Sequence, residues 1–191
     1  MNFAGHVRDV ALRVVELLER ENVPYALMGG LVVPIWGIPR ATYDVDVTVL
    51  GDLPVVERIL ATAKAAGFTV EAPFERGFRD QVSGMDKLRI DWWTPESRCV
   101  EVDVFLVTTD YQRAAFARRV SAQIDHTKAW VLGPADLVLH KLVAGRPKDL
   151  ADIQNILAVQ GLVDAPYLRE WAARLRVAER LNECLRQAGL A

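Results

Sequence analysis

The chain has 191 residues, of which 51% are hydrophobic and 25% charged, and its formal net charge is −2. This length fits one medium domain, or a core domain with a small appendage, and excludes two full enzyme domains. The composition excludes a disordered chain, and the nearly neutral charge excludes an overall basic field of the kind that drives non-specific nucleic-acid binding.

The elements follow from the spacing of apolar residues, which is three to four in amphipathic helices and two in half-buried strands. In chain order the patterns predict a helix over residues 4–21, a strand over 25–28, a helix over 31–36, a strand over 44–50, a helix over 54–67, strands over 87–93 and 100–107, a short helix over 110–118 and a strand over 129–132. From Pro134 onward every pattern is helical. We therefore expect an α/β (α+β) front, residues 1–132, followed by a helical segment, residues 133–191.

Two strands carry acidic residues at alternate positions. Asp44 and Asp46 lie two apart, so both carboxylates project from one strand face, about 7 Å apart at Cα, while the valines between them face the core. The strand over 100–107 repeats this pattern with Glu101 and Asp103. If the strands are neighbours, Asp103 completes a three-carboxylate group of the kind that binds Mg²⁺ at phosphoryl-transfer sites; a solvated strand face is the alternative.

Gly29 and Gly30 separate the strand over 25–28 from the helix that follows. Glycines in such a turn let the backbone approach a ligand closely, and the N–H groups that open the helix can bind phosphate. The two glycines therefore complement the acidic strand as a candidate nucleotide site.

The glycine pair, thirteen intervening residues and the D-x-D strand resemble the nucleotidyltransferase superfamily of the DNA polymerase beta type, here as Y-A-L-M-G-G-L-V-V-P-I-W-G-I-P-R-A-T-Y-D-V-D-V-T-V. The later segment P-A-D-L-V-L-H-K-L-V-A-G-R-P-K-D-L-A-D-I is similar to the AbiEii-type branch, the toxins of type IV toxin–antitoxin pairs, and to related uncharacterised bacterial nucleotidyltransferases. The resemblance covers roughly residues 20–160 and implies a small mixed sheet flanked by helices.

The resemblance also implies transfer of a nucleoside monophosphate from an NTP to an acceptor hydroxyl, with two Mg²⁺ ions. Its implied catalytic residues are Asp44, Asp46, Asp103 and Lys141, with the three aspartates as metal ligands, and its implied nucleotide-binding residues are Gly29, Gly30, Arg40, Thr42, Lys148 and Asp149. The resemblance gives Asp103 the further role of a base that acts on the attacking hydroxyl.

Several of these residues have a second interpretation. Glu101 and Asp91 are rival third acids, because both lie on the same strand or its neighbour. Asp149 lies in the first turn of a helix and is suited to complement the helix dipole. Lys148 and Asp152 are four residues apart and are equally consistent with a surface ion pair.

The sequence does not identify the acceptor, which can be tRNA or another RNA, a protein side chain or a small antibiotic. If the chain is a toxin, a cognate antitoxin is a further partner. The alternatives are an antibiotic-modifying nucleotidyltransferase, a non-catalytic regulatory or antitoxin-like module on the same fold, and a metal-dependent phosphohydrolase or nuclease, which leaves the glycine pair unexplained.

Cys99 and Cys184 lack the spacing of zinc and redox motifs. No run of apolar residues reaches the length of a membrane span, and the first 13 residues lack the apolar stretch of a signal peptide. We therefore expect a cytoplasmic protein without a membrane partner.

Overall fold

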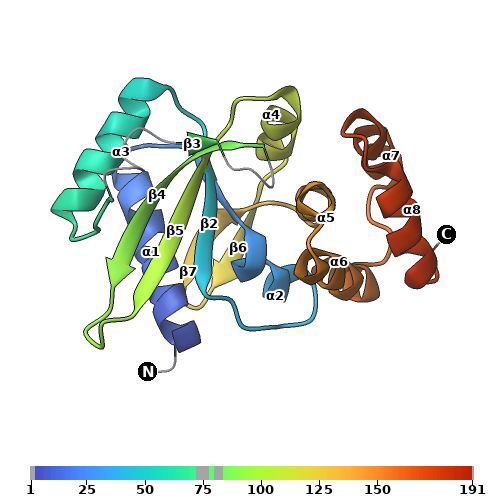
Figure 1. Ribbon diagram of the computed structural model, residues 1–191, viewed down its shortest axis with the longest axis horizontal. Coiled ribbons are helices and arrows are strands. Elements are labelled where there is room, and N and C mark those ends of the chain that lie inside the picture. The colour runs from blue at the N-terminus through green and yellow to red at the C-terminus, as the bar shows by residue number, and fades with distance from the viewer. Residues whose placement is uncertain (1–2, 72–77, 80–83, 191) are drawn as a thin grey trace.

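The computed structural model describes residues 3–71, 78–79 and 84–190. Its elements in chain order are α1 (Phe3–Arg20), β1 (Tyr25–Met28), a 3-10 turn (Gly29–Leu31), α2 (Val33–Trp36), β2 (Asp44–Val49), α3 (Leu53–Ala65), β3 (Phe78–Arg79), β4 (Asp86–Trp93), β5 (Cys99–Leu106), α4 (Asp110–Ala117), β6 (Val120–Ile124), β7 (Thr127–Val131), α5 (Pro134–Ala144), α6 (Pro147–Gln160), α7 (Ala165–Arg174) and α8 (Ala178–Gln187). The expected α/β front and helical continuation are both present (Figure 1).

One mixed sheet organises the front of the molecule, with strand order β3-β4-β5-β2-β1-β7-β6. β2 pairs in parallel with β5 and antiparallel with β1, and β4 pairs antiparallel with β5. The two acidic strands are therefore direct neighbours. In their register Asp46 lies opposite Asp103, and Asp44 lies opposite Glu101.

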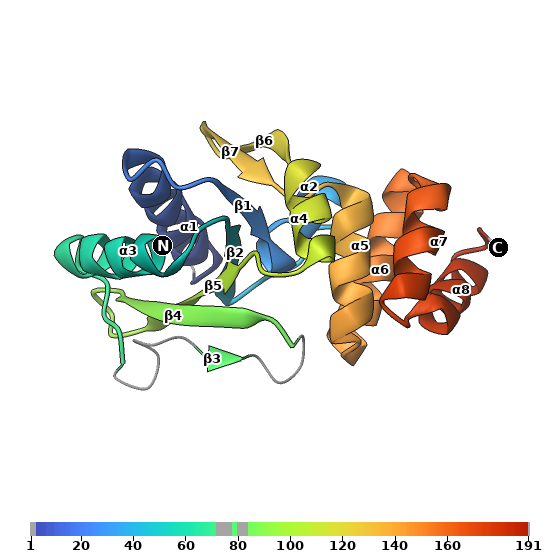
Figure 2. The ribbon, with the colours of Figure 1, turned by 90° about the horizontal axis from the view of Figure 1, so that it is seen from above.

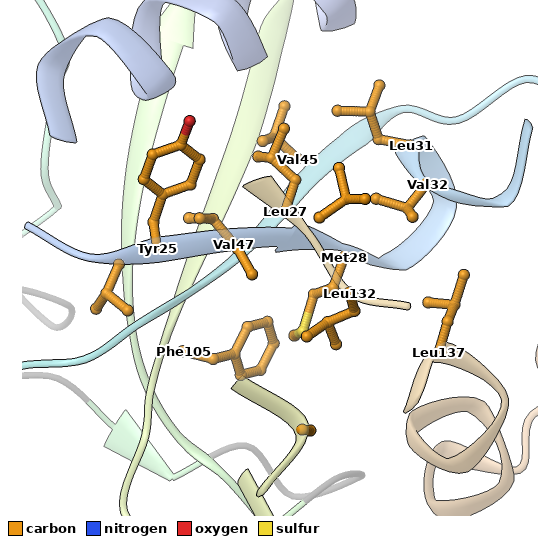
Figure 3. Packing of buried hydrophobic residues seen from close by; sticks show 14 of the residues in the cluster. Tyr25, Leu27, Met28, Leu31, Val32, Val45, Val47, Phe105, Leu132 and Leu137 are labelled. Carbon is orange, nitrogen blue, oxygen red and sulfur yellow. The ribbon is translucent and has the colours of Figure 1, made fainter. Parts of the chain in front are cut away.

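The two faces of the sheet differ because side chains alternate along each strand. Val45, Val47 and Val49 are fully buried on one face, as predicted, together with the valines of β5. Helices α1 and α3 lie over this face (Figure 2), and Figure 3 shows Val45 and Val47 close to Leu27 of β1. Burying each such side chain contributes roughly 1.5–3 kcal/mol, so this face carries the core and leaves the acidic face to the site.

Two elements of the front lie outside the predicted set. β6 forms an antiparallel hairpin with β7, and the short β3 pairs with β4. The β6 pattern was missed because its side chains are mostly exposed, so it has no apolar alternation to detect.

Helices α5 to α8 lie together at one end of the sheet (Figure 1, Figure 2), and α5 and α6 are the two that line the cavity described below. α5 begins with Pro134 and ends at Gly145, which has a left-handed backbone. Leu137 of α5 is fully buried and points toward the end of β1, near Met28 (Figure 3). The division into residues 1–132 and 133–191 as separate domains stays a prediction.

In the described part of the chain, no helix combines the length and the apolar character that crossing a membrane requires.

Candidate active site

A cavity lies between the acidic face of the sheet and helices α5 and α6. Its walls come from the end of β1 and its glycine turn, from β2, β4 and β5, and from the facing helices. Among the residues predicted for the site, those that line this cavity are Gly29, Gly30, Arg40, Asp44, Asp46, Asp103, Lys141, Lys148 and Asp149. Thr42 lines an adjoining pocket, which shares Gly30 and Arg40 with the cavity.

Gly29 brings the backbone into close contact with the acidic strand. Its φ is +67°, a backbone conformation that residues other than glycine rarely adopt. A Cβ at this position would stand 1.9 Å from Oδ2 of Asp46. A Cβ on Gly30 would stand 2.4 Å from the hydroxyl oxygen of Thr42. The positions of Asp46 and Thr42 therefore favour glycine at both positions, whatever ligand the turn binds.

The two aspartates of β2 have different surroundings. Thr42 donates a hydrogen bond of 2.8 Å from Oγ1 to Oδ1 of Asp44. Asp46 makes no ion pair with any described residue, and burial, followed by the negative charges of Asp44 and Asp103, raises its pKa to about 7. Lys141 and Lys87 favour the ionised carboxylate, but their effect is smaller than that of burial and the two acids, so a bound cation would relieve the remaining cost.

Asp103 is held by two cations from β4. Lys87 Nζ lies 2.5 Å from Oδ2 of Asp103, and Arg89 Nε lies 2.9 Å from Oδ1. Within residues 3–71, 78–79 and 84–190, no three or more His, Cys, Asp or Glu side chains are grouped as ligands for one metal ion. The metal-binding and base roles of Asp103 stay predictions, and the carboxylates that fit a cation best are Asp44 and Asp46.

The rival third acids, Glu101 and Asp91, are not among the described residues that line the cavity. They lie opposite each other on β5 and β4, two pairs along the register from Asp103 and Arg89. Glu101 is exposed and pairs with Arg89 at 3.1 Å. The register therefore places Asp103, rather than either rival, beside Asp46.

Asp152 of α6 is fully buried and connects the two walls of the cavity. It accepts hydrogen bonds from Arg40 Nε at 2.5 Å and Arg40 Nη2 at 2.6 Å, and from Lys141 Nζ at 2.6 Å. Burial raises the pKa of Asp152, but these hydrogen bonds outweigh burial and the net effect is a lowered pKa. The interpretation of Asp152 and Lys148 as a surface ion pair is therefore wrong.

Asp149 is also buried, and it serves the start of α6 as well as the cavity. Its Oδ2 accepts hydrogen bonds from the backbone N–H of Arg146 at 3.2 Å and from Arg146 Nε at 2.6 Å. Lys141 Nζ lies 3.6 Å from Oδ1 of Asp149, so this lysine stands between two carboxylates. Lys148 is exposed at the rim and has no ion pair among the described residues.

Sequence reasoning missed four charged or titratable residues at the site: Lys87, His140, Arg146 and Asp152. His140 lines the cavity, and burial together with Lys141 lowers its pKa to about 4, so it is neutral at pH 7. Asp152 had a usable signal, because it lies three residues after Asp149 and thus on the same helix face. The sequence contains no such signal for Lys87, because the alternation of residues shows on which face of the strand Lys87 lies but not which residue of the neighbouring strand it contacts.

The fold is shared with solved nucleotidyltransferases. ANT(2")-Ia in complex with adenylyl-2"-tobramycin superposes with a TM-score of 0.61 at 12% identity, over 88% of this chain and 96% of that one. An antigenic nucleotidyltransferase-like protein from Paracoccidioides brasiliensis superposes with a TM-score of 0.54 at 18% identity, over 96% of this chain and 92% of that one. The lincomycin-bound lincosamide adenylyltransferase LnuA superposes with a TM-score of 0.50 at 15% identity, over 78% of this chain and 95% of that one. At these identities the likeness concerns the fold.

No curated protein matches the sequence. The family described as "Nucleotidyltransferase of unknown function (DUF6036)" matches residues 8–186, which is nearly the whole chain. The superfamily inferred from the glycine pair and the acidic strand is confirmed, whereas the toxin branch stays a prediction. The chain belongs to this family of nucleotidyltransferases.

Proposed function

We propose that the protein transfers a nucleoside monophosphate from an NTP to an acceptor hydroxyl in the cavity between the sheet and helices α5 and α6. The single observation that carries this proposal is the convergence of Asp44 and Asp46 with the Gly29–Gly30 turn and with cations from the opposite helices. Carboxylates for a divalent ion, a close backbone turn and positive charge for phosphates are the groups this reaction needs.

We assign the phosphates of the NTP to the part of the cavity that helix α6 lines. Lys141 is engaged by Asp149 and Asp152, and Arg146 is engaged by Asp149, so their charges are largely compensated. Lys148 keeps an uncompensated charge in the described structure and lines the same cavity. We therefore assign Lys148 to the triphosphate, with Lys141 and Arg146 as a fixed positive background.

The residues present fit a divalent ion at β2. Asp46 has a raised pKa and no ion-pair partner in the part of the chain that the structure describes, and Asp44 keeps an oxygen beyond the one that Thr42 occupies. Mg²⁺ is commonly held by one or two carboxylates together with substrate phosphates and water, which matches this pair. When bound, the ion neutralises phosphate charge and lowers the pKa of the acceptor hydroxyl.

In the proposed reaction the acceptor oxygen forms a bond to the α-phosphorus of the NTP. The bond from that phosphorus to the bridging oxygen breaks, and pyrophosphate leaves with the electron pair. The hydroxyl proton passes to solvent water. The protein's part is positioning: the Gly29 turn fixes the phosphates against β2, and Arg40, through Asp152, fixes the helical wall opposite.

The acceptor class is proposed as a small molecule with free hydroxyl groups. Two structures with this fold contain an adenylylated tobramycin and lincomycin, and the net charge of −2 does not favour a large nucleic acid. A toxin that modifies tRNA, with a cognate antitoxin, is the second candidate, and it is carried by the similarity of the α5–α6 segment to the AbiEii-type branch.

The test incubates the protein with each α-labelled NTP and Mg²⁺ against three acceptor pools: an aminoglycoside and lincosamide panel, total tRNA, and cell-extract protein. We expect label on one pool, with pyrophosphate release, and a loss of about 100-fold or more in Asp44→Asn. Asp9→Asn, an exposed aspartate of α1 outside the cavity, is the matched control. Transfer that persists in Asp44→Asn contradicts the proposal, and label on tRNA selects the second candidate.

A further inference from the structure

The carboxylate of Asp103 is fully engaged by protein cations. Lys87 Nζ lies 2.5 Å from one oxygen, and Arg89 Nε lies 2.9 Å from the other, with Arg89 Nη2 at 3.4 Å from the first. Both cations come from β4, the strand paired with β5 on the side away from β2. Asp103 thus differs from Asp46, whose carboxylate has no ion pair within the described residues.

Lys87 is buried, with 4% of its surface exposed, yet it lines the cavity together with Asp44, Asp46 and Asp103. Its ammonium also lies 5.3 Å from the centre of the Phe105 ring, which packs against it from β5. An ammonium held by a carboxylate and an aromatic ring has little freedom to move away. Lys87 is therefore a fixed positive charge at the cavity, next to the acids.

The charge balance differs from that of a bare three-carboxylate group. Asp44, Asp46 and Asp103, together with Glu101, which pairs with Arg89, and the cations Lys87 and Arg89, carry a formal net charge of −2. Before the triphosphate binds, one divalent ion at Asp44 and Asp46 brings this group to about 0, whereas a second ion at Asp103 would bring it to about +2. Mg²⁺ also needs oxygens at about 2.0–2.1 Å, so an ion on Asp103 would lie close to the positive charges of Lys87 and Arg89, which already donate to both of its oxygens.

We propose that Lys87 takes the place of a second divalent ion, so that the site uses one Mg²⁺, at Asp44 and Asp46, and the Lys87 ammonium, held by Asp103. This inference rests on the proposed function and replaces the two Mg²⁺ ions that the family resemblance implies. The bonds made and broken are those given above, and Lys87 keeps its proton throughout. Its ammonium faces the non-bridging oxygens of the reacting phosphoryl group, and Asp103 is a positioning residue.

The first test counts bound ions by electron paramagnetic resonance of Mn²⁺. The full-length protein is measured in complex with the α,β-methylene analogues of ATP, GTP, CTP and UTP in turn, so that the result does not depend on one base. We expect one Mn²⁺ per chain with the spectrum of an isolated ion. Two ions per chain, with the spectral coupling of ions about 4 Å apart and with one of them lost in Asp103→Asn, would overturn the inference.

The second test compares Lys87→Met with Lys87→Arg and with the control Lys128→Met, an exposed lysine of β7. We expect Lys87→Met to lower transfer by about 100-fold or more, Lys87→Arg to recover part of it, and Lys128→Met to leave it unchanged. Transfer by a folded Lys87→Met variant at the normal rate overturns the inference. If Lys87→Met does not fold, the number of Mn²⁺ ions bound by the unmodified protein still decides between one ion and two.

These outcomes separate the two proposals. Failure of the unmodified protein to transfer any nucleotide, together with Mn²⁺ binding that is insensitive to Asp44→Asn, rejects the proposed function itself. Two Asp44-dependent ions with normal transfer reject only the replacement of an ion by Lys87.

Discussion

Removing the carboxylate of Asp152 is expected to destabilise the protein strongly. The side chain is completely buried and accepts three short hydrogen bonds from two cations, two from Arg40 and one from Lys141. Asp152→Ala leaves the guanidinium of Arg40 without this partner and, among the described residues, leaves Lys141 with the 3.6 Å contact to Asp149 as its one ion pair. Breaking a buried ion pair from one side costs about 3–5 kcal/mol, which corresponds to a fall in Tm of roughly 6–20 °C in a chain of this size.

The measurement is chemical denaturation followed by circular dichroism, with the free energies of unfolding compared at pH 7. Glu170→Ala is the matched control, because Glu170 is exposed and pairs with Arg174 at 3.5 Å within one helix, a contact worth less than about 1 kcal/mol. Because the pKa of Asp152 is lowered in the folded state, its contribution is present above the unfolded carboxyl pKa and is lost as the pH falls below it. A free energy of unfolding for Asp152→Ala within about 1 kcal/mol of the unmodified protein would refute the reasoning.

Two other perturbations test the acidic strand. Gly29→Ala places a Cβ against Asp46, so we expect it to abolish transfer and to lower the free energy of unfolding by about 2 kcal/mol or more. The control is Gly189→Ala, at φ +69° with no described atom within 4 Å of the added Cβ, which should lower that free energy by about 1 kcal/mol and leave transfer intact. Equal effects of the two variants would contradict the close approach of Gly29 to Asp46. The folded-state pKa of Asp46, about 7, lies above the unfolded value, so its ionisation lowers stability as the pH rises from about 4 through 7. Without divalent ions, Asp46→Asn should therefore be more stable than the unmodified protein by up to about 4 kcal/mol at pH 8 and nearly equal to it at pH 4, and a pH-independent difference in unfolding free energy would refute this. For the same reason, calorimetry should show the Mg²⁺ affinity of the unmodified protein falling by up to about tenfold per pH unit below pH 7, and a constant affinity would contradict the raised pKa.

The sequence predicted the strand that carries Asp44 and Asp46 because alternation identifies both a strand and its two faces. The partner of Asp103 could not be predicted, because pairing between β4 and β5 depends on register, and a shift of one residue would turn Lys87 away from the cavity. Asp152 was misassigned for a related reason. A helix position i+4 from a lysine indicates a surface pair unless another part of the chain, here Arg40, supplies a stronger partner and buries it.

The contact between Arg40 and Asp152 spans 112 positions of the chain and joins the segment before β2 to helix α6. A fragment that stopped after β7 would keep all three aspartates but would leave Arg40 without its acidic partner and would lack Lys141 and Lys148, which line the cavity. The two halves of the molecule are thus chemically interdependent. A protein engineer who wished to transplant this chemistry would have to move both halves together.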